Sequence, residues 1–175
     1  DYQVILDRCN HPWRKLTETW RRARLLDRAV RDSEARHGKF DLILSHLHKT
    51  DRIVRQTPAL DGDRTWFCLH GVFSASYLAR KTGFSLWLKR LKIRHVYQDR
   101  QIVGVSQYVI DDMVQNIGVQ PRQAKVIANP FDFDSLARLA AEPCPLAGTD
   151  FLVHVGRFHE TKRHDRLLEA YALSG

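Results

Sequence analysis

Short apolar runs alternate with helical patterns along this chain. Five runs have the length of one buried strand, and they occupy residues 40–44, 65–69, 101–105, 125–128 and 151–155. Between them, apolar residues recur every three or four positions, as on one face of a helix. Strand-like and helical patterns that alternate at least five times predict an α/β fold with a parallel sheet.

The longest helical pattern begins after Asn10 and Pro12 and ends at Gly38. Asn is a favoured N-cap, Pro suits the first turn, and Gly commonly follows the last turn. Arginines crowd the polar positions of this pattern, and Trp13 and Trp20 occupy apolar ones. Two interpretations stay open. The helix lies on an anionic membrane, or its cations are solvated while its tryptophans pack on the sheet.

Polar or small residues follow three of the predicted strands: His70 and Gly71, Ser106, and Asn129. Open α/β sheets bind ligands at the carboxyl ends of their strands. His70 therefore either meets a ligand in a cleft or bonds a neighbouring backbone group. Ser106 is expected first as a helix cap, and Asn129 first as a turn residue.

His46 and His48 follow the run at 40–44 with the spacing His-x-His, which raises the question of a metal site. No acidic residue or cysteine lies at a standard ligand spacing from them, so a metal is disfavoured and none is expected. A ligand-facing loop at the end of a strand is the favoured interpretation.

Cations gather after the last apolar run, at Arg157, Lys162, Arg163 and His164, beyond the break at Gly156. A helical pattern begins there, and the positive end of a helix dipole disfavours cations by a few tenths to about 1 kcal/mol each. This arrangement predicts that an anion binds at the site, since a strand, a glycine turn and a helix N-terminus form a common phosphate cradle. The alternative is a solvated charged loop.

The charge of the chain is unevenly distributed. Its 175 residues are 43% hydrophobic, enough for a core, and carry a net charge of +8. No acidic residue occurs between Arg64 and Gln98, where aromatic and basic residues interleave. This segment predicts a contact surface for anionic lipid or a phosphorylated acceptor, with nucleic acid as the disfavoured competitor. The predicted contact residues are Arg80, Lys81, Lys89, Arg90, Lys92 and Arg94.

Three cysteines without a Cys-x-x-Cys spacing argue against a disulfide framework and fit a reducing compartment. The sequence shows no signal peptide and no apolar run near the ~18 residues that a spanning helix needs. The chain has no initiator Met. We therefore expect a piece of a longer cytoplasmic protein.

Three motifs in this order resemble the GT-B retaining glycosyltransferases of family four. The first two are Val105–Val114 (VSQYVIDDMV) and Val126–Asp132 (VIANPFD). The third combines Gly156-Arg157-Phe158, Lys162 and Leu167-Leu168-Glu169-Ala170. The string Cys68-Leu69-His70-Gly71 is similar to the end of a strand in that family. The pair Lys162-Arg163 resembles the bacterial lipopolysaccharide-core branch, where many other members have Lys-Gly.

The resemblance implies a Rossmann-like parallel sheet domain of a GT-B glycosyltransferase, followed by the first β-α unit of a second Rossmann-like domain. Residues 1–145 would be the acceptor-side domain, incomplete at its start, and residues 146–175 the beginning of the donor-side domain. The implied reaction moves a sugar, with retention, from a nucleotide-diphosphate sugar to a glycan or lipid-linked acceptor. The setting would be bacterial lipopolysaccharide or surface polysaccharide synthesis, at the cytoplasmic face of the inner membrane.

The resemblance also assigns roles to individual residues. Gly156, Arg157 and Lys162 would bind the donor diphosphate without a metal or other cofactor. His70 would be catalytic, orienting the sugar or the acceptor. Asn129 and Ser106 would line the cleft.

Two motifs of the family are missing, a glycine-rich loop and a Glu-x7-Glu pair, so we expect this piece alone to be inactive. Another interpretation is a non-catalytic basic module that binds anionic lipid or nucleic acid. A different Rossmann-type enzyme is disfavoured because no Gly-x-Gly-x-x-Gly follows a strand.

Overall fold

The computed structural model describes residues 4–7, 9–10, 13–144 and 146–174. The chain divides into two compact units, Asp1–Pro130 (unit 1) and Phe131–Gly175 (unit 2). The strands of the described chain all lie in unit 1. The domain boundary predicted after residue 145 stays a prediction.

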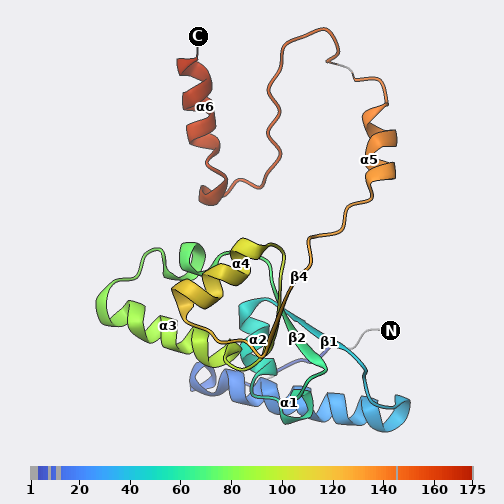
Figure 1. Cartoon of the computed structure of the whole chain (residues 1–175), viewed down its shortest axis with the longest axis vertical. Coiled ribbons are helices and arrows are strands. Elements are labelled where there is room, and N and C mark those ends of the chain that lie inside the picture. The colour runs from blue at the N-terminus through green and yellow to red at the C-terminus, as the bar shows by residue number, and fades with distance from the viewer. Residues whose placement is uncertain (1–3, 8, 11–12, 145, 175) are drawn as a thin grey trace. The chain divides into compact units, whose positions relative to one another are not determined.

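Four parallel strands form the sheet of unit 1, which confirms the predicted fold class (Figure 1). They are β1 (Ile43–His46), β2 (Thr65–Leu69), β3 (Gln101–Gly104) and β4 (Gln123–Val126). Their order in the sheet is β1-β2-β3-β4, and each pair of neighbours is parallel. Parallel neighbours need a crossover segment between them, which the helices supply.

The first helix of unit 1 precedes β1, and its other helices lie between consecutive strands in chain order. The α helices are α1 (Arg14–His37), α2 (His48–Val54), α3 (Gly83–Tyr97) and α4 (Gln107–Asp111). Shorter turns are η1 (Pro58–Leu60), a 3₁₀ helix, and the π-helical segments η2 (Ser74–Leu78) and η3 (Asp112–Ile117). In Figure 1, α3 and α4 lie to the left of the strands and α1 runs along the lower side of the unit.

The core lies on one face of the sheet, as the alternation along β2 shows. Thr65, Phe67 and Leu69 are buried, whereas the two residues between them are half-buried. Because alternate side chains of a strand point to opposite faces, this pattern identifies the packed face. Further fully buried side chains come from α3, β3 and the segment after α4, namely Ile93, Tyr97, Ile102, Met113, Ile117 and Val119.

The long helix α1 packs through Ala23 and Val30, its two buried residues, and it contacts α2 and η1. It ends before Gly38, whose φ of 86° suits glycine. Trp13 and Trp20 are 65% and 56% exposed. The interpretation that these tryptophans pack on the sheet is therefore wrong.

Unit 2 contains α5 (Phe133–Ala140), the 3₁₀ turn η4 (Glu160–Lys162) and α6 (His164–Leu173). The helix of the predicted β-α unit is thus present, but no strand forms at residues 151–155. A strand needs a neighbour to pair its backbone groups, and the strands of the described chain pair only within the sheet of unit 1. The side chains from Phe151 to Val155 are exposed.

Candidate functional site

The four strands end at one edge of the sheet because they are parallel. The register pairs His46 with Cys68 and Leu69 with Gly104, so the ends of β1, β2 and β3 are adjacent. The sheet therefore brings three predicted site residues to the same edge, although they are far apart in sequence: His70 after β2, Ser106 after β3 and Asn129 after β4.

A pair of histidines lies at this edge. The Nδ1 atom of His46 and the Nε2 atom of His70 are 2.8 Å apart, within hydrogen-bond distance. Their rings stack with centroids 5.1 Å apart and an angle of 24° between the planes. Both side chains are exposed. His70 thus bonds a neighbouring side chain, whereas its sequence position predicts a ligand or a backbone group as the partner.

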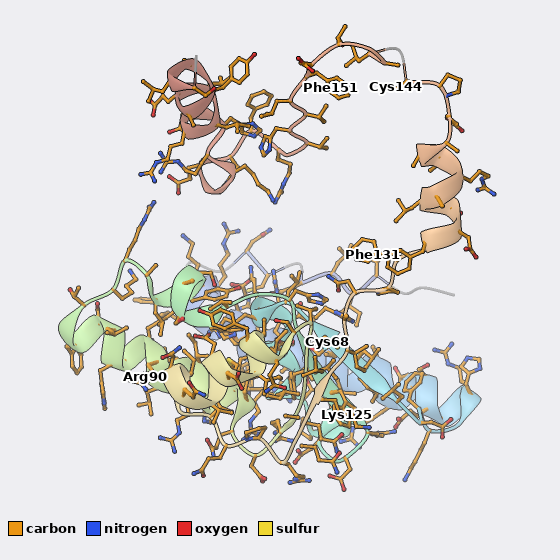
Figure 2. The ribbon with its side chains drawn as sticks, turned by 45° about the horizontal axis from the view of Figure 1, so that its top comes forward. Cys68, Arg90, Lys125, Phe131, Cys144 and Phe151 are labelled. Carbon is orange, nitrogen blue, oxygen red and sulfur yellow. The ribbon has the colours of Figure 1, made fainter. Side chains whose placement is uncertain are left out.

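A cavity of about 210 Å³ adjoins His70. It is lined by residues that follow β1 and β2, together with residues of α2 and η2, including His48, Asp51, Cys68, Gly71, Phe73 and Tyr77. Figure 2 shows Cys68 among the strands of unit 1. A larger cavity of about 490 Å³ is lined by residues of α2 and α3 and the turn after α2, among them the cations Arg52, Arg55 and Lys92. None of the residues that follow β1, β2 or β3 directly lines it.

A buried hydrogen-bond network forms one wall of the smaller cavity. Asp51, 1% exposed, accepts hydrogen bonds from the Tyr97 hydroxyl (2.7 Å) and the Ser45 hydroxyl (2.6 Å). Since Tyr97 donates to Asp51, its oxygen accepts from the Nδ1–H of His48 at 3.0 Å. Each side chain of this network therefore has a hydrogen-bond partner, and such a satisfied network is rigid.

Burial shifts the protonation of this network. It raises the pKa of the Asp51 carboxyl, against the opposing effect of the hydrogen bonds from Ser45 and Tyr97. It lowers the pKa of His48 to about 4, and the positive charges of Lys89 and Arg52 act in the same direction. Burial and the Asp51 carboxylate raise the pKa of Tyr97. His48 is therefore neutral at pH 7, which matches its role as a donor to an uncharged hydroxyl.

The loop after β1 has an unusual backbone. Leu47 has φ 74° and ψ 127°, a combination that side-chain-bearing residues rarely adopt. Its side chain is 69% exposed, so burial of an apolar group does not compensate for the strain. Strained residues persist where the surrounding structure fixes them, commonly at functional sites. Here the strained residue separates the exposed His46 from the buried His48.

Asp112 holds the segment after β2, which contributes Gly71 and Phe73 to the lining of the cavity. Its carboxylate, 2% exposed, accepts hydrogen bonds from the backbone N–H groups of Phe73 (2.8 Å) and Ser74 (3.0 Å) and from Asn116. Burial raises the pKa of Asp112, but these hydrogen bonds outweigh it and leave the pKa below its ordinary value. The segment after β2 is thereby held by a permanent negative charge. An added Cβ on Gly71 would meet no atom within 4 Å, so the backbone there is open to a ligand.

Ser106 and Asn129 are both exposed. Ser106 occupies the N-cap position of α4, but its hydroxyl makes no capping hydrogen bond. Its carbonyl oxygen accepts from the N–H of Val109 at 3.2 Å. The cleft-lining role of both residues stays a prediction.

The predicted diphosphate site lies in unit 2. Arg157 and Lys162 are exposed, and within the described part of the chain no carboxylate lies within ion-pair distance of either cation. The methylene chain of Lys162 runs beside Gly156, where an added Cβ would lie 3.5 Å from Lys162 Cγ. Two unpaired cations on one short segment leave their charge available for an anion.

His164 organises this segment. Its Nε2–H donates to the carbonyl oxygen of Arg157 (2.9 Å), and its ring stacks on Phe158 with centroids 4.8 Å apart. Arg163 precedes α6 with φ 49° and forms an ion pair with Asp165 at 2.7 Å. The cluster of free cations predicted at this helix start is therefore smaller than expected, because Arg163 is already paired.

The basic surface lies on α3 and the segment before it. Phe84, Trp87 and Leu91 are 74%, 56% and 46% exposed and recur at helical spacing, opposite the buried Ile93 and Tyr97. Phe84 and Trp87 stack with ring centroids 5.5 Å apart. The helix thus carries a second apolar stripe that faces away from the core.

Cations flank the exposed apolar stripe of α3: Lys89, Arg90, Lys92 and Arg94. Figure 2 shows Arg90 on this helix, and its Nε–H donates to the carbonyl oxygen of Ile117 at 3.2 Å. Lys89 lies over the ring of Tyr77, 5.8 Å from its centroid. None of these four cations has a carboxylate within ion-pair distance in the described ranges. Arg80 and Lys81 are exposed just before the helix.

The described residues contain no group of three or more His, Cys, Asp and Glu side chains that could hold a metal ion. The His-x-His spacing does not act as a unit, because His46 faces His70 while His48 is buried against Tyr97. None of the described helices has the length and hydrophobicity needed to cross a membrane.

The sequence predicts His46 and His48 in a ligand-facing loop, but it does not predict the contact of His46 with His70 or the membership of Asp51 and Tyr97 in this site. The contact between His46 and His70 had a usable signal, since each histidine follows a predicted strand and the ends of neighbouring parallel strands are adjacent. Asp51 and Tyr97 are 46 residues apart and offered no signal in spacing. Only the packing of α2 against α3 and the sheet brings them together.

Comparison with known proteins agrees with this architecture. Residues 2–135 match the model of Glycosyltransferase Family 4. The chain is also similar to a Campylobacter jejuni protein, N-acetylgalactosamine-N,N'-diacetylbacillosaminyl-diphospho-undecaprenol 4-alpha-N-acetylgalactosaminyltransferase. The two are 25% identical over 112 residues, which is 63% of this chain and 30% of that relative's length. No solved structure matches the chain.

Proposed function

Because this chain belongs to Glycosyltransferase Family 4, we propose that the complete protein transfers a sugar from a nucleotide-diphosphate donor to a lipid-linked acceptor. The relative from Campylobacter jejuni acts, by its name, on a diphospho-undecaprenol-linked saccharide and forms an alpha linkage. A lipid-linked acceptor and transfer with retention are proposed here by that similarity. A role in bacterial lipopolysaccharide or surface polysaccharide synthesis is the narrower form of the same proposal.

The proposal of a donor site rests on two exposed cations without a carboxylate partner in the described chain, Arg157 and Lys162. When the bond to the sugar breaks, negative charge develops on the departing diphosphate, and fixed cations stabilise that charge most where water is scarce. An arginine can bind two phosphate oxygens at once, and a lysine adds a point charge. Together they would supply the charge stabilisation that other transferases obtain from a metal ion.

The strand-end cavity is the proposed sugar or acceptor site. His70 is exposed beside it, and the cavity presents hydrogen-bonding and aromatic groups, the combination that small polar ligands require. Ser106 and Asn129 would extend the same edge. His70 would touch the sugar or the acceptor and is the proposed catalytic residue.

Sugar transfer tests this proposal directly. The complete gene product would be incubated with a panel of UDP-, GDP- and ADP-sugars and an undecaprenyl-diphosphate-linked saccharide. We expect transfer from at least one donor, and a loss of about 10- to 100-fold in kcat/KM for Arg157→Ala and for Lys162→Ala, since a charge-assisted hydrogen bond contributes about 1.5–3 kcal/mol. The control is Arg138→Ala, a cation of α5. Equal activity in all variants would refute the assignment of the two cations.

The proposed location is the surface of an anionic membrane, bound through the apolar stripe of α3 and its flanking cations. An exposed aromatic stripe between cations is the pattern of helices that lie in the interface plane. Each cation near an anionic leaflet contributes about 1 kcal/mol. The same features favour a membrane over nucleic acid, because Phe84 and Trp87 stack on one another and leave fewer faces for bases.

Vesicle binding separates these partners. The variant Lys92→Gln/Arg94→Gln should bind vesicles of 30% phosphatidylglycerol roughly 30-fold more weakly than the native protein, which is about 2 kcal/mol for two cations. The matched control Arg138→Gln/Arg166→Gln removes two exposed cations of unit 2 and should bind normally. Saturable oligonucleotide binding through Lys92 and Arg94 without vesicle binding would instead support the basic-module alternative.

A further inference from the structure

The hydrogen bond between His46 and His70 links the tautomers of the two rings. The contact joins Nδ1 of His46 to Nε2 of His70 at 2.8 Å, so one of these two nitrogen atoms must donate and the other must accept. The bond therefore fixes the tautomers of both rings together. It also leaves one nitrogen free on each ring, Nε2 of His46 and Nδ1 of His70, and neither has a hydrogen-bond partner among the described residues.

The atoms in contact indicate which ring donates. If His70 donates, both neutral rings carry their proton on Nε2, the tautomer that free imidazole side chains prefer. If His46 donates, both rings must carry it on Nδ1. The first arrangement is favoured because it places both rings in their preferred form. The free nitrogen of His70 is then an acceptor, and the free nitrogen of His46 is an N–H donor.

The surroundings hold the pair in place without competing for its free nitrogen atoms. Asp51 lines the same cavity as His70, but its oxygens already accept from Ser45 and Tyr97. His48, two residues after His46, is buried and bonded to Tyr97. The strained Leu47 between them turns His46 outward and His48 inward.

We propose that His46 is a positioning residue that fixes His70 as a hydrogen-bond acceptor, so that the pair presents one donor and one acceptor to neighbouring sugar hydroxyls. Each hydroxyl both donates and accepts, so a donor beside an acceptor matches a vicinal diol. The inference rests on the proposed sugar transfer, and it adds a residue and a direction of hydrogen bonding. Both rings are exposed, so a ligand can reach the nitrogen atoms that the pair leaves free.

Two variants of His46 separate the contributions of the pair. His46→Phe keeps an aromatic ring for the stacking contact and removes the hydrogen bond. His46→Asn keeps an acceptor oxygen near the position of Nδ1 and removes the ring. His37→Asn is the matched control, because His37 is an exposed histidine at the end of α1, outside the site.

The first readout does not depend on activity. The ¹⁵N chemical shifts of His70 in the complete gene product should correspond to a single tautomer protonated at Nε2 in the native protein and in His46→Asn. In His46→Phe they should move toward the tautomer average of a free imidazole. Identical shifts in the native protein and His46→Phe would overturn the proposal, since His46 would then not determine the tautomer.

The second readout is transfer of sugar by the same proteins. We expect kcat to fall about tenfold in His46→Phe and less than threefold in His46→Asn, with His37→Asn unchanged. Transfer by His46→Phe at the native kcat and KM would overturn the positioning role while leaving the proposed function intact. If the native protein transfers no sugar, the proposed function fails, and the chemical shifts still decide whether the pair fixes its tautomers.

Discussion

Similar apolar runs form a strand in unit 1 and remain irregular in unit 2. In unit 1, the apolar run Thr65–Leu69 becomes a strand with neighbours on both sides and Phe67 2% exposed. In unit 2, the run Phe151–Val155 has no neighbour and stays irregular, with Val155 89% exposed. Neither α5 nor α6 contains a buried residue. An apolar run therefore specifies a strand only when other strands are available to pair with it.

The contrast extends to the charged residues of each unit. Unit 1 buries Asp51 and Asp112 and gives each carboxylate several hydrogen bonds. Unit 2 keeps Arg157 and Lys162 exposed, without a carboxylate partner in the described chain. The first arrangement fixes the shape of a site, and the second leaves charge available for a ligand. The following changes test this division, from the largest expected effect to the smallest.

The largest effect is expected from truncating a phenylalanine of the core. Phe67→Ala should destabilise unit 1 by about 3–5 kcal/mol, because it removes a buried ring and leaves a cavity. Phe158→Ala removes the same ring from a position that is 95% exposed and should change stability by less than about 0.5 kcal/mol. Urea unfolding followed by far-UV circular dichroism measures both variants, since each unit contains helices. Equal losses of stability in Phe67→Ala and Phe158→Ala would contradict the contrast between the packed core of unit 1 and the exposed side chains of unit 2.

Protonation of His48 should produce the next largest effect. Its folded-state pKa of about 4 lies below the ordinary 6.5, so between these values the unfolded chain binds a proton that the folded chain does not. The stability that His48 contributes is thus present above pH 6.5 and is lost as the pH falls toward 4. Since one pKa unit corresponds to 1.36 kcal/mol, the loss is roughly 3 kcal/mol.

The variant His48→Gln isolates this contribution from those of the buried carboxylates. It should be less stable at pH 7 but lose less stability than the native chain between pH 6.5 and pH 4, as measured by urea unfolding at each pH. Parallel pH profiles for the two proteins would show that His48 titrates normally in the folded state.

Much of unit 1 follows from its sequence. The strand at 65–69 matches β2 residue for residue because its limits are marked by polar and glycine residues on both sides. The edge that carries His70 follows from parallel topology. The wall formed by Asp51, Tyr97 and His48 does not, because it depends on contacts between segments that lie 46 and 49 residues apart.

Two glycines provide a smaller, matched test. A Cβ on Gly104 would lie 2.8 Å from Cδ1 of Ile110 and 3.1 Å from a backbone oxygen, whereas a Cβ on Gly156 would meet side chains no closer than 3.5 Å. Gly104→Ala should therefore destabilise the chain by about 1–3 kcal/mol through overpacking. Gly156→Ala should have an effect below about 0.5 kcal/mol. Differential scanning calorimetry measures both, and a larger loss in Gly156→Ala would contradict the finding that the side chains beside Gly156 can accommodate a Cβ.

The smallest effect is expected at the residue before α6. Arg163 has φ 49° and an exposed ion pair with Asp165. Arg163→Gly removes an exposed ion pair, which contributes little to stability, and relieves a left-handed conformation that is unfavourable for a residue with a side chain. The two effects nearly cancel, so helicity by circular dichroism should not change. A marked loss of helicity would show that the ion pair, and not the backbone, begins α6.

Binding of a nucleoside diphosphate is the measurement that tests the donor site most directly. Isothermal titration of the complete gene product with UDP, GDP or ADP, and with the matching monophosphate, reports whether the diphosphate group is recognised. We predict that one diphosphate binds at least tenfold more tightly than its monophosphate, and that Arg157→Ala and Lys162→Ala each abolish this preference. If the preference is absent, or survives both substitutions, Arg157 and Lys162 do not hold a diphosphate.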